Sequence, residues 1–322
     1  MTDSVGAELL APLAGSSVLV TGGAGFVGSR LAGALAEVCD VTVLDDLTTG
    51  TLAAVPDRAK LVRGDVRDVE TVVPLVTEAD VVFHQAALAD VRTSVRSPVE
   101  THTRNAGGTV TVLDAARRTD TRVVLASTAA VYGRPDSLPV RESDPKRPTS
   151  PYGVAKLAAD EYARTYADLY GLETVVLRYF NVYGADRRDG APDVVSTFAE
   201  RARAGEPLVV HGDGSQTRDF VHVDDVVQAN VRAATTDDTG RAFNVGTGER
   251  TSIRSVAQRV RRATNATSDL VYGEARPGDV DHSCAAIDRA RESLGYEPTV
   301  GIDAGLRSVV RGSAPADWHA VD

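Results

Sequence analysis

The chain has few cysteines, no long apolar run and no basic N-terminal segment, and each shortage argues against a class of protein. Its 322 residues include only Cys39 and Cys284, without C-x-x-C or zinc-ligand spacing. The cysteines therefore indicate neither a disulfide framework nor a metal site, and they suit a reducing compartment. No apolar run approaches the ~18 residues that a membrane helix needs. The acidic first residues do not fit a signal peptide, so we expect a cytoplasmic protein with no membrane partner.

Lysine is also scarce. Lys60, Lys146 and Lys156 stand beside 32 arginines, and 31 aspartates outnumber 14 glutamates. The formal net charge of −10 argues against a nucleic-acid partner, because phosphate contacts need a basic surface. A GC-rich genome can produce such a bias, and so can an acidic surface adapted to high salt. Both explanations concern habitat and leave the activity open.

Hydrophobic residues make up 43% of the chain, enough for a sizeable core. Through the first half, short β-branched runs alternate with helical stretches. Continuous apolar strands separated by helices are typical of a parallel sheet covered on both faces, which right-handed crossovers make doubly wound. We therefore predict an α/β fold of the Rossmann type. The expected strands are 17–23, 41–46, 60–65, 80–86, 122–128 and 173–181.

The pattern changes after about Tyr183, where Gly and Pro become frequent and apolar runs shorten. We expect 1–183 to form the sheet domain and 184–322 to form mainly a smaller C-terminal α/β lobe. Part of 220–245 is expected to return to the first domain. Residues 313–322 show no periodic pattern, so we expect them to be loosely held.

A glycine-rich turn follows the first expected strand. Gly22, Gly25 and Gly28 have G-x-x-G-x-x-G spacing, and Phe26 and Val27 begin the next expected helix. Glycines permit a tight turn and a close approach of the backbone to a pyrophosphate, and the helix N-terminus offers free N–H groups to phosphate. The spacing and its context predict a dinucleotide site.

Asp45 ends the second expected strand, where a carboxylate would accept hydrogen bonds from an adenosine ribose. The same charge would repel a 2′-phosphate, so NAD is favoured over NADP. Asp45 and Asp46 could instead only cap the following loop. Asp65 and Val66 follow the third strand and could flank the adenine, and Asp68 could serve there or as a helix N-cap.

Tyr152 and Lys156 form a Y-x-x-x-K pair on one face of an expected helix. A lysine beside a tyrosine favours the phenolate and makes it a usable base. Since arginine replaces lysine so widely here, Lys156 indicates a role that arginine would fill poorly. Ser127 and Thr128 offer hydroxyls at the carboxyl end of the fifth strand, where ligands bind in such sheets.

These motifs together resemble those of the extended short-chain dehydrogenase/reductase family, over roughly residues 17–311, and within it the UDP-glucose and related UDP-hexose 4-epimerases. The motifs are TGGAGFVG, GDVRD, HQAA, STAAVYG, PYGVAK, LRYFNVYG, GDGSQTRDFVHVDD, FNVGTG and RPGD. The resemblance implies that 1–183 binds NAD and that 184–322 binds the nucleotide-sugar.

The resemblance also implies roles for individual residues. Thr128, Tyr152 and Lys156 would be catalytic. NAD would contact Gly22, Gly25, Phe26, Val27, Asp45, Asp65, Val66, Gln85, Ala86, Ala87, Asn105, Tyr152, Lys156 and Tyr179. The UDP-sugar would contact Thr128, Asn181, Arg218, Arg276, Asp279 and Ser283, with the two arginines on the pyrophosphate.

The dipeptide Ala129-Ala130 distinguishes between relatives. Nucleotide-sugar 4,6-dehydratases of the family usually place an Asp-Glu pair after the Thr, and UDP-glucuronate decarboxylases usually have a Glu in this segment. Two alanines can do neither job, so the resemblance favours an epimerase that uses a transient 4-keto sugar and regenerates NAD. Another nucleotide-sugar-modifying enzyme, including a reductase, or a non-catalytic NAD-binding member are the alternatives.

Further details follow from the same resemblance. Ser283 is small where epimerases restricted to glucose and galactose have a bulky residue, which favours acceptance of N-acetylated sugars. Gly107 stands where many relatives have a second Asn. Helices at 98–118 and 149–170 resemble the pair that forms a homodimer interface.

The histidines show no metal-ligand spacing, so we predict no metal site. We interpret His84 and His222 as structural hydrogen-bonding residues, and we place His211 and His282 in loops.

Overall fold

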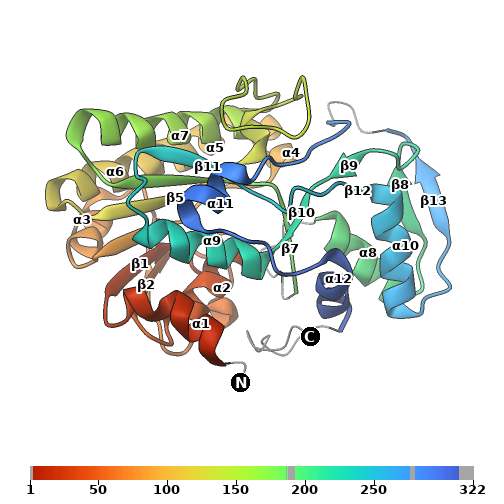
Figure 1. Ribbon diagram of the computed structural model, residues 1–322, viewed down its shortest axis with the longest axis horizontal. Coiled ribbons are helices and arrows are strands. Elements are labelled where there is room, and N and C mark those ends of the chain that lie inside the picture. The colour runs from red at the N-terminus through yellow and green to blue at the C-terminus, as the bar shows by residue number, and fades with distance from the viewer. Residues whose placement is uncertain (1–2, 186, 188–192, 276–279, 312–322) are drawn as a thin grey trace.

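The computed structural model describes residues 3–185, 187, 193–275 and 280–311. Seven parallel strands form the central sheet, in the order β11-β6-β5-β4-β1-β2-β3 (Figure 1). The order reverses between β1 and β4, the switch point of a doubly wound sheet. The predicted fold class is therefore confirmed. The strands are β1 (Ser17–Thr21), β2 (Asp40–Asp45), β3 (Lys60–Arg63), β4 (Val81–His84), β5 (Arg122–Thr128), β6 (Thr174–Tyr179) and β11 (Arg241–Val245).

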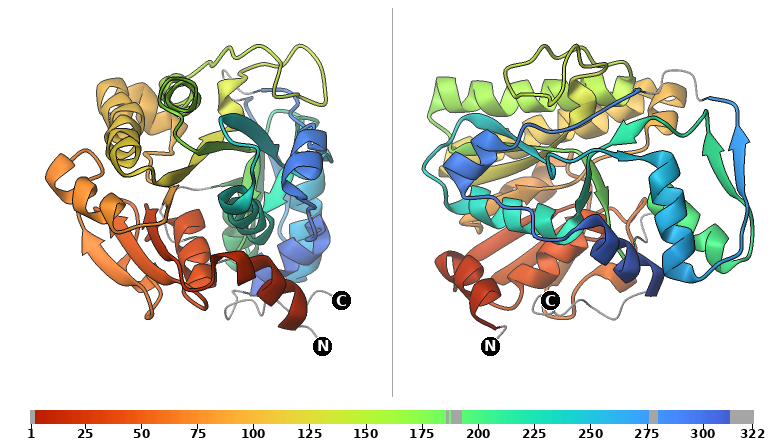
Figure 2. Two further views of the ribbon diagram at one scale, coloured as in Figure 1. Left: turned by 60° about the vertical axis from the view of Figure 1, so that its left-hand side comes forward. Right: turned by 45° about the vertical axis from the view of Figure 1, so that its right-hand side comes forward.

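Helices cover both faces of this sheet, so its central strands are apolar throughout (Figure 2). On β1, Val18 and Val20 pack toward one face and Leu19 toward the other. The first face is covered by α1 (Asp3–Leu10), α2 (Phe26–Leu35), α9 (Val223–Thr235) and α11 (Asp288–Leu294). The second is covered by α3 (Val69–Thr77), α6 (Gly108–Thr119) and α7 (Pro151–Tyr170).

Side-chain caps set where several helices begin. Asp68 accepts a hydrogen bond from Glu70 N at 3.1 Å and starts α3, so its N-cap role is confirmed. Ser150 caps α7 by accepting from Gly153 N at 3.1 Å, and Pro151 follows at the first helical position. These caps fix the register of α7, which carries the Y-x-x-x-K pair.

The helix expected at 98–118 is interrupted. The structure has α5 (Pro98–His102), a π-helical turn at Thr103–Gly107 and then α6. Local periodicity predicts helix throughout and cannot distinguish a π turn, which adds one residue between turns. This turn buries Asn105 beneath the loop after β4.

The second lobe has its own apolar core, around Phe198, Leu208 and Val256. His211 is the last residue of β8 and pairs with Gly273, so its placement in a loop was wrong. His282 makes an isolated β-bridge with Thr217. The elements are α4 (Val91–Arg96) in the first lobe, β7 (Asn181–Tyr183) and β10 (Phe220–His222) between the lobes, and α8 (Val194–Arg203), β8 (Leu208–His211), β9 (Thr217–Arg218), β12 (Thr251–Ser252), α10 (Ile253–Thr264), β13 (Leu270–Gly273) and α12 (Ile302–Arg311) in the second.

The chain crosses between the lobes more than once. After the second lobe has begun, α9 packs against the sheet and β11 extends it beside β6. The sequence indicated this return at 220–245. It did not indicate that α11 would also pack on β11.

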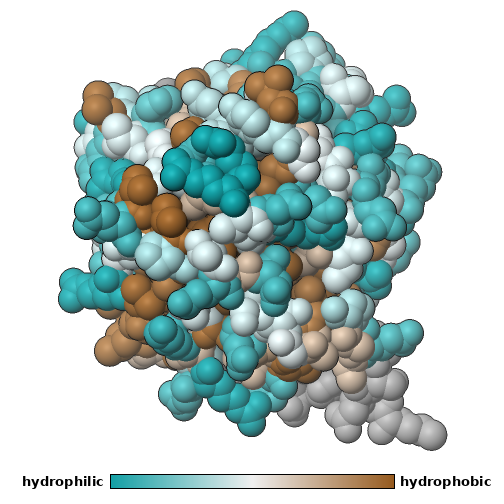
Figure 3. Space-filling view, turned by 90° about the vertical axis from the view of Figure 1, so that its left-hand side faces the viewer, coloured by the Kyte–Doolittle hydropathy of each residue, from teal (hydrophilic) through white to brown (hydrophobic). Residues whose placement is uncertain are grey.

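One outer face of the molecule can be judged by its hydropathy. Polar side chains dominate the face at the left of Figure 1, among scattered hydrophobic residues (Figure 3). No helix in the described part of the chain is both long and apolar enough to cross a membrane.

A buried ion pair joins β6 to α7. Arg178 is 1% exposed and donates to both carboxylate oxygens of Asp160, at 2.8 and 3.0 Å. Ser127 donates to the same carboxylate at 3.0 Å, and Arg178 also donates to Tyr132 Oη at 2.9 Å. Burial raises the cost of leaving either charge alone.

Replacing Arg178 tests this pair. We expect Arg178→Met to lower the free energy of unfolding by about 3–5 kcal/mol, because the buried Asp160 carboxylate loses its two-fold pairing with the guanidinium and keeps only Arg164 and Ser127. Urea unfolding at neutral pH measures the change. Arg118→Met removes an exposed partner of Asp114 and should cost less than about 1 kcal/mol. Equal losses in the two variants would contradict this assignment.

Candidate functional site

The glycine turn lies at the carboxyl edge of β1, beside the switch point. Gly22 has φ +70°, and a Cβ there would come within 2.6 Å of Ala86 N in the segment after β4. A Cβ at Gly28 would overlap Gly22 O. Both positions therefore require glycine, one for its conformation and both for close packing. The structure brings the turn and the HQAA motif together, as the dinucleotide prediction requires.

The start of α2 presents unpaired backbone donors to this turn. Gly25 is the N-cap and makes no side-chain cap, and Phe26 and Val27 are the first two helical residues. Unpaired N–H groups at a helix N-terminus bind phosphate well. This backbone cradle fits the pyrophosphate of a dinucleotide.

Asp45 links β2 to the glycine turn. Its two carboxylate oxygens accept from Ala24 N at 2.9 Å and Leu47 N at 2.8 Å. The loop-capping role is therefore real, and each oxygen keeps lone pairs for a ribose. Burial raises the pKa of Asp45.

Two ion pairs border the expected adenine position. Asp65 binds Arg67, which holds the pKa of Asp65 below its usual range. Asp46 accepts from Arg104 Nη1 at 2.6 Å. Val66 lies against Gly108, where a Cβ would come within 2.7 Å of it.

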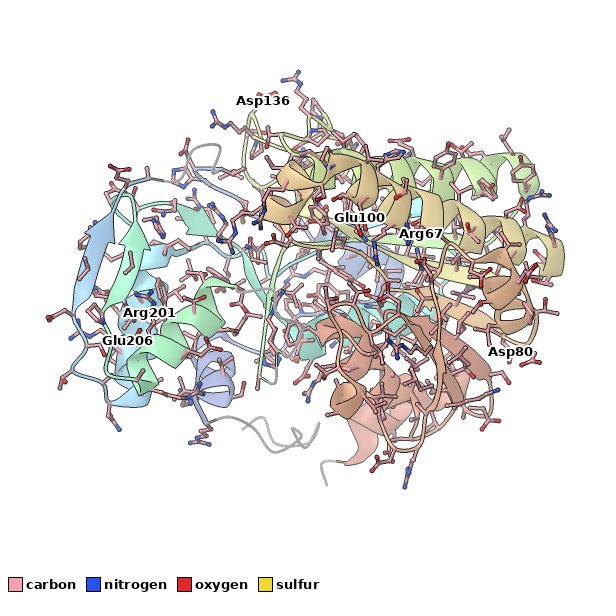
Figure 4. All side chains as sticks on the ribbon, turned by 180° about the vertical axis from the view of Figure 1, so that it is seen from behind. Arg67, Asp80, Glu100, Asp136, Arg201 and Glu206 are labelled. Carbon is pink, nitrogen blue, oxygen red and sulfur yellow. The ribbon has the colours of Figure 1, made fainter. Side chains whose placement is uncertain are left out.

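The two ends of the sheet can be told apart in Figure 4. Arg67 and Glu100 are labelled near one another at this carboxyl edge, whereas Asp80 lies at the opposite end. There Asp80 accepts from Ser17 N at 2.8 Å, at the start of β1.

His84 is a structural residue, as the sequence analysis predicted. Its ring nitrogens bind Thr21 Oγ1 at 2.7 Å and Thr109 Oγ1 at 3.0 Å. Burial, with the nearby charge of Lys156, lowers its pKa to about 3. The ring is therefore neutral at physiological pH. His222 likewise caps α9, accepting from Asp224 N at 3.3 Å.

Gln85 and Tyr179 belong to a buried hydrogen-bond network that the motifs did not reveal. Gln85 Nε2 donates to Asn230 Oδ1 at 2.9 Å, and the Tyr179 hydroxyl donates to Gln85 Oε1 at 3.2 Å. Asn230 Nδ2 in turn donates to that hydroxyl at 2.8 Å. Asn230 comes from α9, so only the return of the chain to the first lobe brings it here.

Asn105 fixes the segment that follows Ala87. Its side chain accepts from Leu88 N at 2.7 Å and donates to Leu88 O at 3.1 Å. A Cβ at Gly107 would meet nothing within 4 Å, so packing alone does not require glycine there.

Thr128, Tyr152 and Lys156 converge where β5 ends and α7 begins. Thr128 is close enough to Tyr152 to lower the pKa of its phenol. Lys156 is 4% exposed, and its Nζ donates to Ala126 O at 2.9 Å. Burial lowers the pKa of Lys156 to about 8.

Tyr152 is a neutral phenol at pH 7 in this geometry. Burial raises its pKa to about 12, against the opposing effects of Thr128 and of the positive charge of Arg187. The Lys156 ammonium is bound to the backbone of β5 instead of the Tyr152 hydroxyl. Additional positive charge near Tyr152 would be needed to make it a base.

Arg187 is a site residue that the sequence analysis missed. It lies 5.0 Å over the Phe26 ring and 3.4 Å from an Asp193 carboxylate oxygen. It follows the YFNVYG motif in a stretch without periodic pattern, and only its cationic character could have suggested it.

Most of the candidate substrate residues lie in the second lobe or on β7 between the lobes. Asn181 is exposed on β7, and Arg218 lies on β9, where Nη1 donates to Thr217 O at 2.9 Å. Ser283 is half-buried and its N–H donates to Thr217 O at 3.1 Å. Arg276 and Asp279 fall outside the described residues.

Asp219 connects the loops around Arg218 and Ser283 through backbone amides. Its carboxylate accepts from Thr247 N at 2.8 Å, Gly248 N at 3.0 Å and Ala285 N at 3.0 Å. Since Ala285 closely follows Ser283, the buried carboxylate positions both neighbouring candidates, Arg218 and Ser283. Its family motif, TRDF, did not indicate this role.

The chain is similar to known proteins over most of its length. The profile of the NAD dependent epimerase/dehydratase family matches residues 18–246. The UDP-glucose 4-epimerase of Mycolicibacterium smegmatis is 39% identical over 303 residues, covering 91% of this chain and 96% of that protein. The structure of Thermus thermophilus UDP-glucose 4-epimerase in complex with NAD is 37% identical, with a TM-score of 0.85 over 92% of this chain and 98% of that one. UDP-N-acetylglucosamine 4-epimerase from Methanobrevibacter ruminantium is 31% identical, with a TM-score of 0.89 over 93% and 98% of the two chains.

The burial of Lys156 predicts a specific dependence of stability on pH. Its pKa falls from 10.5 to about 8 on folding. Below the folded value the ammonium is charged in both states and its burial is penalised. Above the unfolded value it is neutral in both states and the penalty vanishes, so this contribution makes the protein more stable as pH rises between the two.

We therefore expect Lys156→Met to gain up to about 3 kcal/mol in unfolding free energy near neutral pH, and progressively less as the pH approaches 10. Chemical denaturation at several pH values measures the difference. Lys60→Met removes an exposed lysine and controls for the loss of charge. A difference that does not change with pH would argue against a charged, buried Lys156.

Proposed function

The chain belongs to the NAD-dependent epimerase/dehydratase family, and we propose that within it the protein inverts C4 of a UDP-hexose, with NAD as its cofactor. The observation that supports this proposal best is the group of Thr128, Tyr152 and Lys156 at the carboxyl edge of the sheet, followed by Ala129 and Ala130. This group provides a hydroxyl, a phenol and an ammonium, without a further acid or base on the adjoining residues.

The residues present fit NAD. The Gly22 turn and the start of α2 would hold the pyrophosphate, Asp45 the adenosine ribose, and Lys156 the nicotinamide ribose. NAD, when bound, supplies a reversible hydride acceptor. Its positive nicotinamide would also stabilise the Tyr152 phenolate, which the protein alone disfavours.

The chain's own groups then move the proton and hold the substrate. Tyr152 takes the proton of the sugar 4-OH, and Thr128 hydrogen-bonds the same region of the sugar. Arg218, with Arg276, would clamp the UDP pyrophosphate, and Asp279 would hold the uridine ribose. Asn181 would contact the sugar nucleotide. Because UDP stays clamped, a 4-keto sugar can turn over and receive hydrogen on its opposite face.

The alternatives differ in their products. A dehydratase, decarboxylase or reductase would change the mass of the sugar or the amount of NADH, and a non-catalytic member would change neither the sugar nor NADH. Ala129 and Ala130 lack the groups that elimination needs. Ser283, small and half-buried on the substrate lobe, favours acceptance of N-acetylated sugars as well as UDP-glucose and UDP-galactose.

Incubation with four sugars tests the proposal. UDP-glucose, UDP-galactose and the two UDP-N-acetylhexosamines are each supplied without added reductant, and the epimers are separated. We expect conversion to the C4 epimer at constant mass and constant NADH. A product of altered mass would favour the alternatives, and no product from any of the four sugars would contradict the proposal.

Tyr152→Phe is the sharpest test of the mechanism. Loss of the proton acceptor should lower kcat by about 10²- to 10⁴-fold, because general base catalysis contributes that much. The rate of epimer formation measures it, and UDP-induced thermal stabilisation confirms that the variant still folds and binds. Tyr170→Phe removes an exposed hydroxyl from the same helix and should retain the rate. Unchanged activity of Tyr152→Phe would rule out this role.

We also propose a homodimer formed by the outer helices. The helices α4 and α5 pack against α7 (Figure 1) and leave large apolar side chains exposed: Val91, Val95, Val99 and Val154, between 44% and 76% exposed. Exposed apolar groups on helices that pack together are typical of an interface.

The cytoplasmic location of the protein stays a prediction.

A charge in this face should disrupt the dimer. We expect Val95→Asp to elute as a monomer in size-exclusion chromatography with light scattering, because the carboxylate would be buried unpaired. Val271→Asp introduces the same charge at an exposed valine of β13 and should not alter the mass. A monomeric native protein would refute the proposal.

A further inference from the structure

One cavity lies apart from the residues that we assign to NAD and to the UDP-sugar. It has a volume of about 240 Å³ and opens beside the edge strand β11, between α7, α11 and the loop before α7. Its lining residues are Glu142, Lys146, Arg164, Arg178, Gly240, Arg241, Ala242 and Arg289. None of them belongs to the candidate NAD or UDP-sugar site.

Five of the eight lining residues are cationic, and one is a carboxylate. Carboxylates partly balance them. Asp160 pairs with Arg178 and Arg164, and Asp238 pairs with Arg241 at 2.8 Å. The Glu142 carboxylate accepts from Asn244 N at 2.9 Å and lies 3.9 Å from Arg289.

Lys146 is the least compensated of these cations. Its Nζ donates to the backbone oxygen of Glu142 at 2.6 Å, and no carboxylate within the described ranges forms an ion pair with it. Burial and the charges of Arg178 and Arg164 lower its pKa, against the smaller opposing effects of Asp160 and Glu161. The cationic neighbours outweigh the carboxylates at this ammonium, so an anion bound beside it would be favoured. Two of the chain's three lysines thus occupy special positions, Lys156 in the catalytic group and Lys146 here.

We propose that this cavity binds a small multivalent oxyanion of the phosphate class. Guanidinium groups pair with such oxygens in forks of two hydrogen bonds, and an ammonium adds a point charge. The volume is below the ~300 Å³ at which pockets for drug-sized ligands begin, so the site suits inorganic phosphate better than a nucleotide. This proposal does not depend on the proposed function.

The position connects the bound anion to the catalytic segment. Lys146 and Glu142 lie on the loop that leads into Tyr152 on α7, and Arg178 is paired with Asp160 one turn beyond Lys156. An anion held between Lys146, α7 and Arg289 would cross-link this loop to two helices. We therefore expect binding to raise the thermal stability of the whole chain.

Thermal unfolding of the full-length protein with increasing phosphate, at ionic strength held constant with NaCl, tests the site. The midpoint should rise and saturate with the native protein. Lys146→Met should weaken the apparent affinity by about 10- to 100-fold, since it removes a charged hydrogen bond. Arg289→Gln should act in the same direction and replaces Lys146→Met if that variant does not fold.

Two control variants locate the effect. Arg291 is on the same helix α11 as Arg289, but it pairs with Glu297 and does not line the cavity. The Arg291→Gln variant should therefore respond to phosphate as the native protein does. Arg218→Gln lies in the facing lobe and should also keep the response. If phosphate stabilises no more than chloride, or if Arg218→Gln abolishes the effect and Lys146→Met does not, the proposal is wrong.

Discussion

The buried ion pair between Arg178 and Asp160 joins β6 to α7, and the rest of the candidate site depends on it. Two charges without solvent are stable only when each is paired and hydrogen-bonded, and here Ser127, Tyr132 and Arg164 complete the arrangement. The pair locks α7 onto β5 and β6. Since α7 carries the Y-x-x-x-K residues and β5 ends in Thr128, the relative position of these three proposed catalytic residues depends on it. The same guanidinium also lines the cavity beside β11.

The distribution of charge explains how a protein with a net negative charge could bind anionic ligands. The net charge is −10, yet cationic and backbone donors gather at the glycine turn, at Lys156, at Arg187 and at Arg218. Desolvation has opposite consequences for two of the proposed catalytic residues: it lowers the pKa of Lys156 to about 8 and raises the pKa of Tyr152 to about 12. A cationic nicotinamide beside Tyr152 would reverse the second effect. The protein by itself thus keeps Tyr152 protonated, and proton transfer would await the cofactor.

Much of the sheet domain was predictable because its signals are local. Apolar runs predicted the strands within about two residues of the observed bounds, and glycine spacing predicted the phosphate turn. At Asp45 the sequence could not decide between capping the loop and binding a ribose. The two roles are compatible, since its carboxylate binds Ala24 N and Leu47 N and retains lone pairs. The π turn at Thr103–Gly107 and the strand assignment of His211 were missed, because periodicity does not encode an inserted residue or a short edge strand.

The sequence alone determined the fold class and the family, since these follow from periodicity and from motifs within a few residues of each other, and the same motifs predict which side chains are catalytic. Only the tertiary structure decided which distant residues share an environment. Asn230 reaches Gln85 and Tyr179 because α9 returns to the first lobe, Asp219 organises the substrate lobe through loop amides, and Lys146 meets Arg289 beside β11. These contacts join segments tens to hundreds of residues apart. Their burial, which shifts the pKa values of Lys156 and Tyr152, exists only after the chain has folded.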